Sequence, residues 1–319
     1  MSDDLNNILD SLMSAELPVS ELPVEVLSDL GREGQSFLSR KWALIPQERR
    51  VELVQELGDR EALQFDLDFS SVHFIGIRDN DPEVISSSIR NLAGLDNPHT
   101  LPDLLDLISH ENPSVRYEAA SAMGYFIYLG ELDEIPEELA KRTLATLLQV
   151  HRNDADERIR CAALESLGYS EYGDIPDLIL RALNSDDLAQ SLSAMRAIGR
   201  SADPDWEPSV LKYLHNLHPE MRLEAVRAAG ELELKATLQD LVELLDDVDR
   251  SIRLAAIWSI AQIGGEEVED LLAHLLEANE DVEEIDLIED ALSLVEFNKG
   301  IDDMLLLNLD PDNPGQAQI

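Results

Sequence analysis

The chain has 319 residues, 44% of them hydrophobic, which is enough to bury a large core in one extended array or in two compact domains. Its 66 acidic residues outnumber its 24 basic residues, and the formal net charge is −42 at pH 7. Such a charge repels phosphate backbones and anionic lipid, so we expect neither nucleic acid nor a membrane as a partner. It favours basic partners, although adaptation to a salty cytoplasm would leave the same acidic surface.

A single cysteine, Cys161, excludes an intrachain disulfide and fits a reducing compartment. Its position inside a repeated apolar pattern predicts a buried filler residue rather than a nucleophile. The first residues, MSDDLNNILD, carry acids where a secretory signal carries Lys or Arg, and no apolar run approaches the roughly 18 residues of a membrane span. We therefore expect a cytoplasmic protein.

The N-terminal segment, residues 1–62, holds amphipathic pieces such as SELPVEVLSDL and PQERRVELVQELGD. They predict a helical cap or extension before residues 63–296, where the sequence repeats. Each repeat reads as a pair of helices, because apolar positions recur at helical spacing in two successive stretches. Proline near the expected helix starts agrees with this interpretation. The expected pairs cover about residues 69–94, 100–124, 137–168, 175–199, 207–230, 236–263 and, in a degenerate form, 266–296.

The second helix of each pair carries the clearest pattern. Its anchor positions are Arg116, Arg160, Ser191, Arg222 and Arg253, separated by one step of 44 residues and then three of 31. Alanine stands three residues after every anchor, which predicts a helix contact too close for a larger side chain. These alanines are Ala119, Ala163, Ala194, Ala225 and Ala256. An insertion of 13 residues at 125–137 explains the longer first step, and we expect it to lengthen a helix or a loop, as a kink or a docking point.

The C-terminal segment, residues 297–319, is expected to be an acidic tail that follows the array. Within it, MLLLNLD at 304–310 is an apolar run. Two interpretations stay open: the run packs back onto the last repeat, or it acts as a short peptide ligand.

The segments VRYEAASAMG, IRCAALESLG, MRLEAVRAAG and IRLAAIWSIA resemble the second helix of HEAT repeats, especially the short bacterial type related to phycobilin-lyase repeats. The resemblance implies an all-α, right-handed α-solenoid (an α–α superhelix) of about seven helical hairpins. It also implies a polar ladder between repeats, in which an Asp six residues before the Arg takes part. The residues in these ladder positions are Arg116, Asp154, Arg160, Arg222, Asp247 and Arg253, with Ser191 in place of one Arg.

Motifs of catalysis are missing from the sequence: it has no Gly-rich phosphate loop, no Gly-x-Ser-x-Gly, no Cys pair and no His-Glu-x-x-His. His215 and His218 are three residues apart, but they straddle a helix junction, so a turn or surface role is expected for them. Deoxyhypusine hydroxylase, which is built on similar repeats, uses several His-Glu pairs around a di-iron site, whereas this chain has only His110-Glu111. We expect no enzyme, no metal and no cofactor.

Positions two, five and nine residues after each anchor point away from the apolar face, and in HEAT-like arrays this surface lines the concave side. Stacking of the repeats predicts that Arg196, Arg200 and Arg227 come together there. Tyr169 and Trp258 are expected to flank them, which gives a groove for an extended acidic or amphipathic peptide. The alternative is that Glu224 neutralises Arg227 and that the aromatic residues only pack.

These features favour a cytoplasmic scaffold or adaptor that binds a protein or peptide on the concave face. A factor of the phycobilin-lyase or chaperone type, acting on a partner protein, is the alternative, and only the family resemblance suggests it. For the groove, Glu at positions 196 and 227 is expected to abolish partner capture without lowering the melting temperature.

Overall fold

The computed structural model describes residues 2–14, 16–93 and 98–308, and every regular element in these ranges is a helix. The chain divides into two compact units, unit 1 of residues 1–170 and unit 2 of residues 171–319. The all-α expectation is confirmed. The sequence did not predict the division, because the repeat pattern continues on both sides of it.

Unit 1 begins with a helical segment before the first expected repeat. It then contains three of the expected helix pairs, α4/α5, α6/α7 and α8/α9. The α-helices of unit 1 are α1 (Ser2–Ser14), α2 (Arg32–Lys41), α3 (Gln47–Leu63), α4 (Ser70–Gly76), α5 (Pro82–Leu92), α6 (Leu101–Leu107), α7 (Pro113–Glu131), α8 (Glu137–Asn153) and α9 (Glu157–Leu167), with short 3-10 turns at Val19–Glu21, Val24–Leu27, Trp42–Leu44 and Pro98–Thr100.

Unit 2 contains the other four expected pairs, α10/α11, α12/α13, α14/α15 and α16/α17. Its α-helices are α10 (Ile175–Leu183), α11 (Leu188–Arg200), α12 (Glu207–Leu214), α13 (Pro219–Glu231), α14 (Leu238–Leu244), α15 (Arg250–Ile263), α16 (Glu266–Ala278) and α17 (Val282–Asn308), with 3-10 turns at Pro204–Trp206 and Lys235–Thr237. The helix pairs lie where the repeat pattern predicted them.

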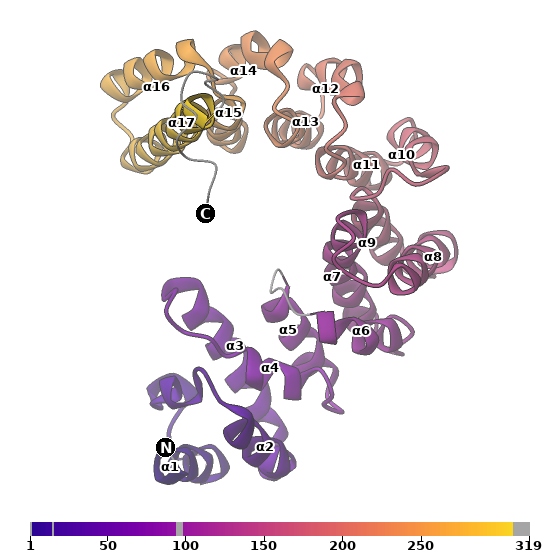
Figure 1. Cartoon of the computed structure of the whole chain (residues 1–319), viewed down its shortest axis with the longest axis vertical. Helices are drawn as coiled ribbons and strands as arrows, with labels where there is room; N and C mark the ends of the chain where they lie inside the picture. Colours follow the sequence, from indigo (N-terminus) through magenta and orange to yellow (C-terminus); the bar gives the residue numbers. More distant parts are fainter. Residues whose placement is uncertain (1, 15, 94–97, 309–319) are drawn as a thin grey trace. The chain divides into compact units, whose positions relative to one another are not determined.

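The second helices of the pairs form a layer of their own in each unit. In unit 2, α11, α13, α15 and α17 pack in succession, and the first helices, α10, α12, α14 and α16, pack against them from the other side. Figure 1 shows the second helices of unit 2 on the inner side of its bend. In unit 1, α3, α5, α7 and α9 form the corresponding layer. Stacking is required because neither face of a single pair is covered without its neighbours.

Small residues set the spacing of the second-helix layer. All five alanines that follow the anchors are fully buried, at Ala119, Ala163, Ala194, Ala225 and Ala256. Gly230 of α13 faces α15 so closely that an added Cβ would lie 2.8 Å from the main-chain Cα of Ser259. Ser259 uses this proximity, because its hydroxyl donates to the carbonyl of Val226 at 2.8 Å. Ser166 of α9 makes the same contact with Ala120 of α7, also at 2.8 Å.

Side-chain caps start most of the second helices. Asp81 and Asn112 precede the prolines that open α5 and α7, and their side chains accept hydrogen bonds from backbone N–H groups of the first helical turn. Asp156, Asp187 and Asp249 cap α9, α11 and α15 in the same way. Such caps satisfy N–H groups that have no partner inside the helix, so they fix where each helix begins.

The N-terminal segment packs onto the first repeat. Leucines and isoleucines of α1, together with Leu38, Leu53 and Leu57, form a buried cluster that reaches Phe69 and Val72 of the first expected pair. Residues 1–62 therefore extend the hydrophobic core of unit 1 to its N-terminal side.

The 13-residue insertion lengthens two helices. Helix α7 has 19 residues and α8 has 17, whereas α9, α11, α13 and α15 have 11 to 14.

At the C-terminal end, α17 continues to Asn308, past the expected start of the tail at residue 297. The apolar run at 304–310 lies outside the residues whose side chains the structure describes.

Candidate partner-binding surface

Arginine–aspartate pairs link successive repeats on one edge of each unit. Arg116 of α7 meets Asp154, at the C-terminal end of α8, through Nε–Oδ2 at 2.9 Å and Nη2–Oδ1 at 3.1 Å. Arg222 and Asp247 make the same two contacts, also at 2.9 and 3.1 Å. Both side chains of each pair are nearly buried. Two parallel N–H···O bonds fix the orientation of the two side chains as well as their distance.

Each arginine of these pairs also reaches back to its own repeat. The Nη1 of Arg116 donates to the carbonyl of His110 at 2.9 Å, and that of Arg222 donates to the carbonyl of Asn216 at 2.9 Å. Each aspartate in turn accepts a backbone N–H from two residues further on. Each arginine thus links two turns. It binds the turn of its own hairpin through a backbone carbonyl, and the turn of the next hairpin through the aspartate.

The carboxylates of these pairs have lowered pKa values. Burial alone would raise the pKa of Asp154 and of Asp247, but hydrogen bonds from the paired arginine and from the backbone, together with the charge of that arginine, hold each pKa below the ordinary value. Both carboxylates are therefore charged at neutral pH, as the pairing requires.

The other ladder positions differ from the pairing that the resemblance implied. Arg160 and Arg253 donate to the backbone carbonyls of Asp154 and Asp247, not to their carboxylates, which are taken by the arginine of the preceding repeat. Ser191 replaces the arginine and itself donates to the carbonyl of Ser185 at 3.1 Å.

A further Arg–Asp pair, which the sequence did not suggest, lies nearer the N-terminus. Arg50 of α3 meets Asp79, with Nε–Oδ2 at 2.7 Å and Nη2–Oδ1 at 3.1 Å, and donates to the carbonyl of Ile45. Gly58 stands eight residues after Arg50, as glycine does after Arg116 and Arg222. This spacing was a usable signal, but leucine at position 53, where the other helices have alanine, obscured it.

The predicted arginine cluster forms in unit 2 around an acid. Arg196 of α11 and Arg227 of α13 both contact Glu224 Oε1, at 3.0 and 3.2 Å. The Glu224 side chain is only 7% exposed, whereas those of Arg196 and Arg227 are 42% and 53% exposed. Glu224 therefore partly neutralises the cluster, as the alternative interpretation expected. The two arginines in turn compensate the charge of its nearly buried carboxylate.

This contact changes the expected result of charge reversal. Glu at position 196 or 227 would place a second carboxylate beside the buried one of Glu224, which costs stability. With this contact in view, we expect charge reversal at either position to lower the melting temperature as well.

Arg200 lies beside a second acid, Glu231. Although Glu231 as a whole is exposed, its carboxylate lies over Gly199 of α11, where the missing side chain leaves room for it. Burial of this carboxylate raises the pKa of Glu231, and the positive charge of Arg200 opposes that rise. Arg200 and Arg227 therefore belong to one mixed-charge network with Glu224 and Glu231.

An open hollow of about 570 Å³ lies next to this network on the second-helix layer. Leu254 and Ala255 of α15 and Leu287 of α17 line its apolar part, and Trp258, which is 39% exposed, stands within it. Its polar lining consists of Arg227, Glu231, Ser251, Ser259 and Gln262. The structure thus brings Trp258 and Arg227 to one surface of unit 2. Sequence reasoning did not include Leu254 and Leu287, which lie outside the offsets chosen for the concave face.

Tyr169 lies in unit 1 with other tyrosines. Its ring is 6.1 Å from that of Tyr128, and the ring of Tyr128 is 6.3 Å from that of Tyr125. Within unit 1, Tyr169 therefore belongs to an aromatic cluster at the lengthened end of α7.

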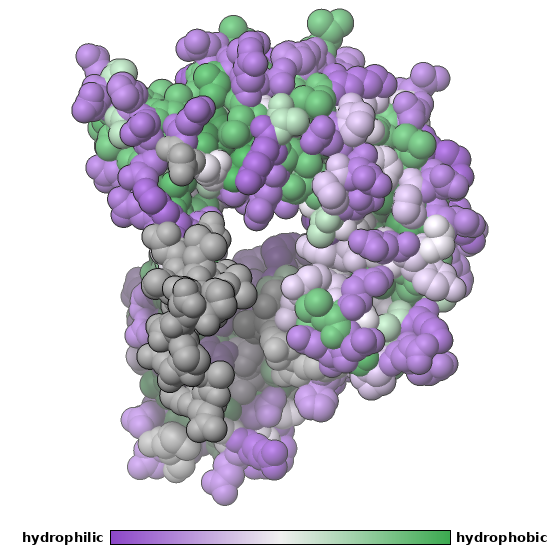
Figure 2. Space-filling model, turned by 45° about the horizontal axis from the view of Figure 1, so that its top comes forward, coloured by the Kyte–Doolittle hydropathy of each residue, from purple (hydrophilic) through white to green (hydrophobic). Residues whose placement is uncertain are grey.

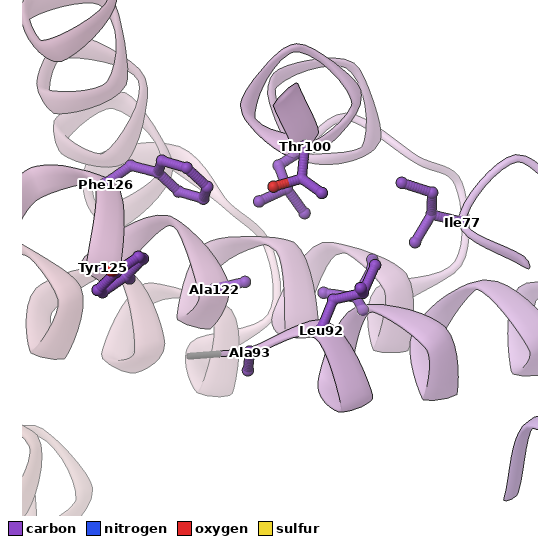
Figure 3. A pocket seen from close by; sticks show the side chains of 9 residues that line it. Ile77, Leu92, Ala93, Thr100, Ala122, Tyr125 and Phe126 are labelled. Atoms are coloured by element: carbon purple, nitrogen blue, oxygen red, sulfur yellow. The ribbon is translucent and has the colours of Figure 1, made fainter. Parts of the chain in front are cut away.

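The remaining candidate features are a small pocket, two histidines and the cysteine. A small, partly open pocket in unit 1, lined by residues including Ile77, Thr100 and Phe126 (Figure 3), has a volume of about 20 Å³. That is room for about one water molecule. His215 contacts Asp240 at 2.6 Å, and His218 is the residue before α13. Cys161 is half-buried rather than fully buried. Across the described ranges, no three His, Cys, Asp or Glu side chains are placed to hold a metal ion.

Hydrophilic residues dominate the surface, as Figure 2 shows for one face. Within residues 2–14, 16–93 and 98–308, no helix is both long enough and apolar enough to cross a bilayer.

Stacked helix pairs with a layered arrangement define an α-solenoid, that is, a helical-repeat protein. Residues 74–141 in unit 1 and 207–293 in unit 2 match the family model of HEAT repeats. These two segments therefore consist of HEAT repeats. The recurring alanine and glycine positions and the Arg–Asp pairs are the local features of these repeats.

Several solved structures are similar to this chain at low sequence identity. YibA of Escherichia coli is 15% identical, with 76% of this chain and 95% of that chain covered and a TM-score of 0.42. Importin β is 13% identical, with 92% of this chain and 47% of that chain covered and a TM-score of 0.45. Human deoxyhypusine hydroxylase is 16% identical, with 82% and 98% covered and a TM-score of 0.34. No curated protein sequence matches this chain. These similarities concern the fold alone.

Proposed function

We propose that this protein is an interaction scaffold that binds a segment of a partner protein in the hollow on the second-helix layer of unit 2. The observation that carries the proposal is the exposed Trp258, which stands among Leu254, Leu287 and Arg227. Exposed tryptophan and arginine beside an apolar floor are the residues that most often dominate the energy of a protein interface.

The surroundings of this hollow support a fixed binding surface. Ser259, which lines it, is held to α13 by its hydrogen bond to the Val226 carbonyl. The neighbouring Arg222–Asp247 pair holds the turn before α15 to α13. A surface that is already ordered loses little conformational entropy when a partner binds.

The charges favour an amphipathic partner segment over a strongly acidic one. Glu224 and Glu231 offset much of the charge of Arg196, Arg200 and Arg227, so the surface keeps one excess positive charge over these five groups. Apolar contact with Trp258 and the leucines then supplies most of the affinity, and Arg227 supplies an orienting contact.

The partner we propose is a protein rather than a nucleic acid, because a net charge of −42 repels phosphates. The proposal also includes a cytoplasmic location and a non-catalytic role. No residue cluster of the described part favours a lyase-like reaction over simple binding.

Affinity capture from the native cytoplasm tests the proposal. The test variant combines Trp258→Ser with Leu254→Ser, and the matched control is Val248→Ser, an apolar residue that is 94% exposed before α15 and outside the hollow. We expect wild type and Val248→Ser to retain the same protein, and the double variant to retain it at least about tenfold less, since hot-spot residues contribute on the order of 2 kcal/mol or more.

Circular dichroism of all three proteins shows whether the fold is retained. Equal capture by the double variant and by Val248→Ser, with both proteins folded, would place the binding surface elsewhere.

A further inference from the structure

The lengthened end of α7 carries an exposed surface that the repeat packing does not require. Helices α11 and α13 end nine residues after their anchors, whereas α7 runs 15 residues beyond Arg116, to Glu131. Gly130 and the buried Ile127 and Leu129 use this extension to pack against neighbouring helices, with Gly130 close to Ala140 of α8. Tyr128 lies between them in sequence and remains 43% exposed.

Three tyrosine rings meet at this end of the helix. The rings of Tyr125 and Tyr128 are inclined by 31°, and those of Tyr128 and Tyr169 by 60°, with centroids 6.3 and 6.1 Å apart. Tyr125 and Phe126 both line the small pocket of unit 1 (Figure 3), and Phe126 is buried. At this end of α7, Phe126 therefore packs inside, and the exposed ring is that of Tyr128.

Acidic residues follow the tyrosines of α7 in the sequence. Glu131 is exposed, and its Oε1 accepts a hydrogen bond at 2.5 Å from Ser170, the residue after Tyr169. Asp133 and Glu134 are exposed in the following turn. Between Arg116 and Lys141 the chain has no Lys or Arg, while it has six acidic residues, at positions 118, 131, 133, 134, 137 and 138.

We propose that this surface, made of Tyr128, Tyr169 and Glu131, is a second docking site, which takes an arginine or lysine side chain from a basic segment of a partner protein. The π face of a tyrosine attracts a cation, and a nearby carboxylate adds a direct charge contact. The net charge of −42 draws a basic segment toward the molecule from a distance. This proposal does not depend on the hollow at Trp258, because the two surfaces lie in different units.

Binding of a labelled arginine-containing peptide to the full chain, measured by fluorescence anisotropy at physiological salt, tests this site. The probe is a short Gly/Ser/Arg peptide, and the same peptide with citrulline in place of arginine removes the charge and keeps the shape. The variants are Tyr128→Leu, which removes the π face, and Tyr128→Phe, which keeps it. Tyr117→Leu is the matched control, because Tyr117 is 42% exposed on the same helix, about 16 Å from Tyr128.

We expect Tyr128→Leu to weaken arginine-peptide binding by about three- to thirtyfold, the range of a partly desolvated cation–π contact. Tyr128→Phe and Tyr117→Leu should bind as wild type does, and the citrulline peptide should bind weakly to every protein. Equal losses in Tyr128→Leu and Tyr117→Leu, or no loss in either, would overturn the proposal, since binding would then come from the overall negative field. A citrulline peptide that binds as tightly as the arginine peptide would overturn it as well.

Discussion

Substitution of Gly230 by alanine probes the close contact between α13 and α15. The new Cβ would lie 2.8 Å from the Cα of Ser259, a main-chain atom that cannot move without shifting α15. Overpacking of this kind costs about 1–3 kcal/mol. Alanine has a better helix propensity than glycine, which returns about 0.5–1 kcal/mol. The expected net result is a loss of up to about 2.5 kcal/mol in the free energy of unfolding, whereas a site without this contact would gain stability.

Gly300→Ala is the matched control for this prediction. Gly300 lies in helix α17, and among the described residues no atom outside its own helix backbone lies within 4 Å of the Cβ it would gain. Helix propensity alone then applies, so Gly300→Ala should stabilise the protein by about 0.5–1 kcal/mol. Urea unfolding followed by far-ultraviolet circular dichroism measures both changes. A Gly230→Ala protein as stable as the Gly300→Ala protein would refute the contact distance between α13 and α15.

Two further predictions concern the links between repeats. Asp247→Asn leaves the nearly buried Arg222 without its carboxylate, so it should lower the free energy of unfolding by about 1–3 kcal/mol at neutral pH. Because the pKa of Asp247 is lower in the folded state, its contribution is present above the unfolded value of about 4 and is lost as the pH falls through the folded pKa. The stability difference between wild type and Asp247→Asn, measured by urea unfolding from neutral pH to about pH 3, should therefore shrink in acid, and a constant difference would contradict the pairing. Ser259→Ala removes the hydroxyl bond to the Val226 carbonyl and should cost about 0.5–1.5 kcal/mol in the same assay, whereas an unchanged midpoint would mean that this bond contributes nothing.

The architecture followed from the sequence because its signals are local and repeated. Alanine three residues after each anchor and proline at the helix starts, such as Pro113 and Pro219, depend only on the geometry of one hairpin and its neighbour. That geometry recurs in every repeat, so each copy of the pattern strengthens the prediction made from the others. The same periodicity placed Arg196 and Arg227 close together, since they lie at related positions of successive second helices.

The parts that the sequence did not predict depend on contacts between repeats. Whether the carboxylate of Asp154 meets Arg160 or Arg116 depends on how far one hairpin is offset from the next, and spacing within one repeat does not contain that offset. The spacing of three residues indicated the contact of Glu224 with Arg227, but not its contact with Arg196 on the preceding second helix. Tyr169 lies with Tyr128 because the insertion lengthens α7, and the length of an insertion does not say where it folds.

Hydrogen exchange of the protein with and without its captured partner tests most directly the claim that unit 2 binds through its second-helix layer. The account predicts slower exchange on binding in α15 and in the facing parts of α13 and α17, around Trp258, Arg227 and Leu287, with unchanged exchange in α12, α14 and α16. Protection confined to α12, α14 and α16, or no protection anywhere in unit 2, would contradict it.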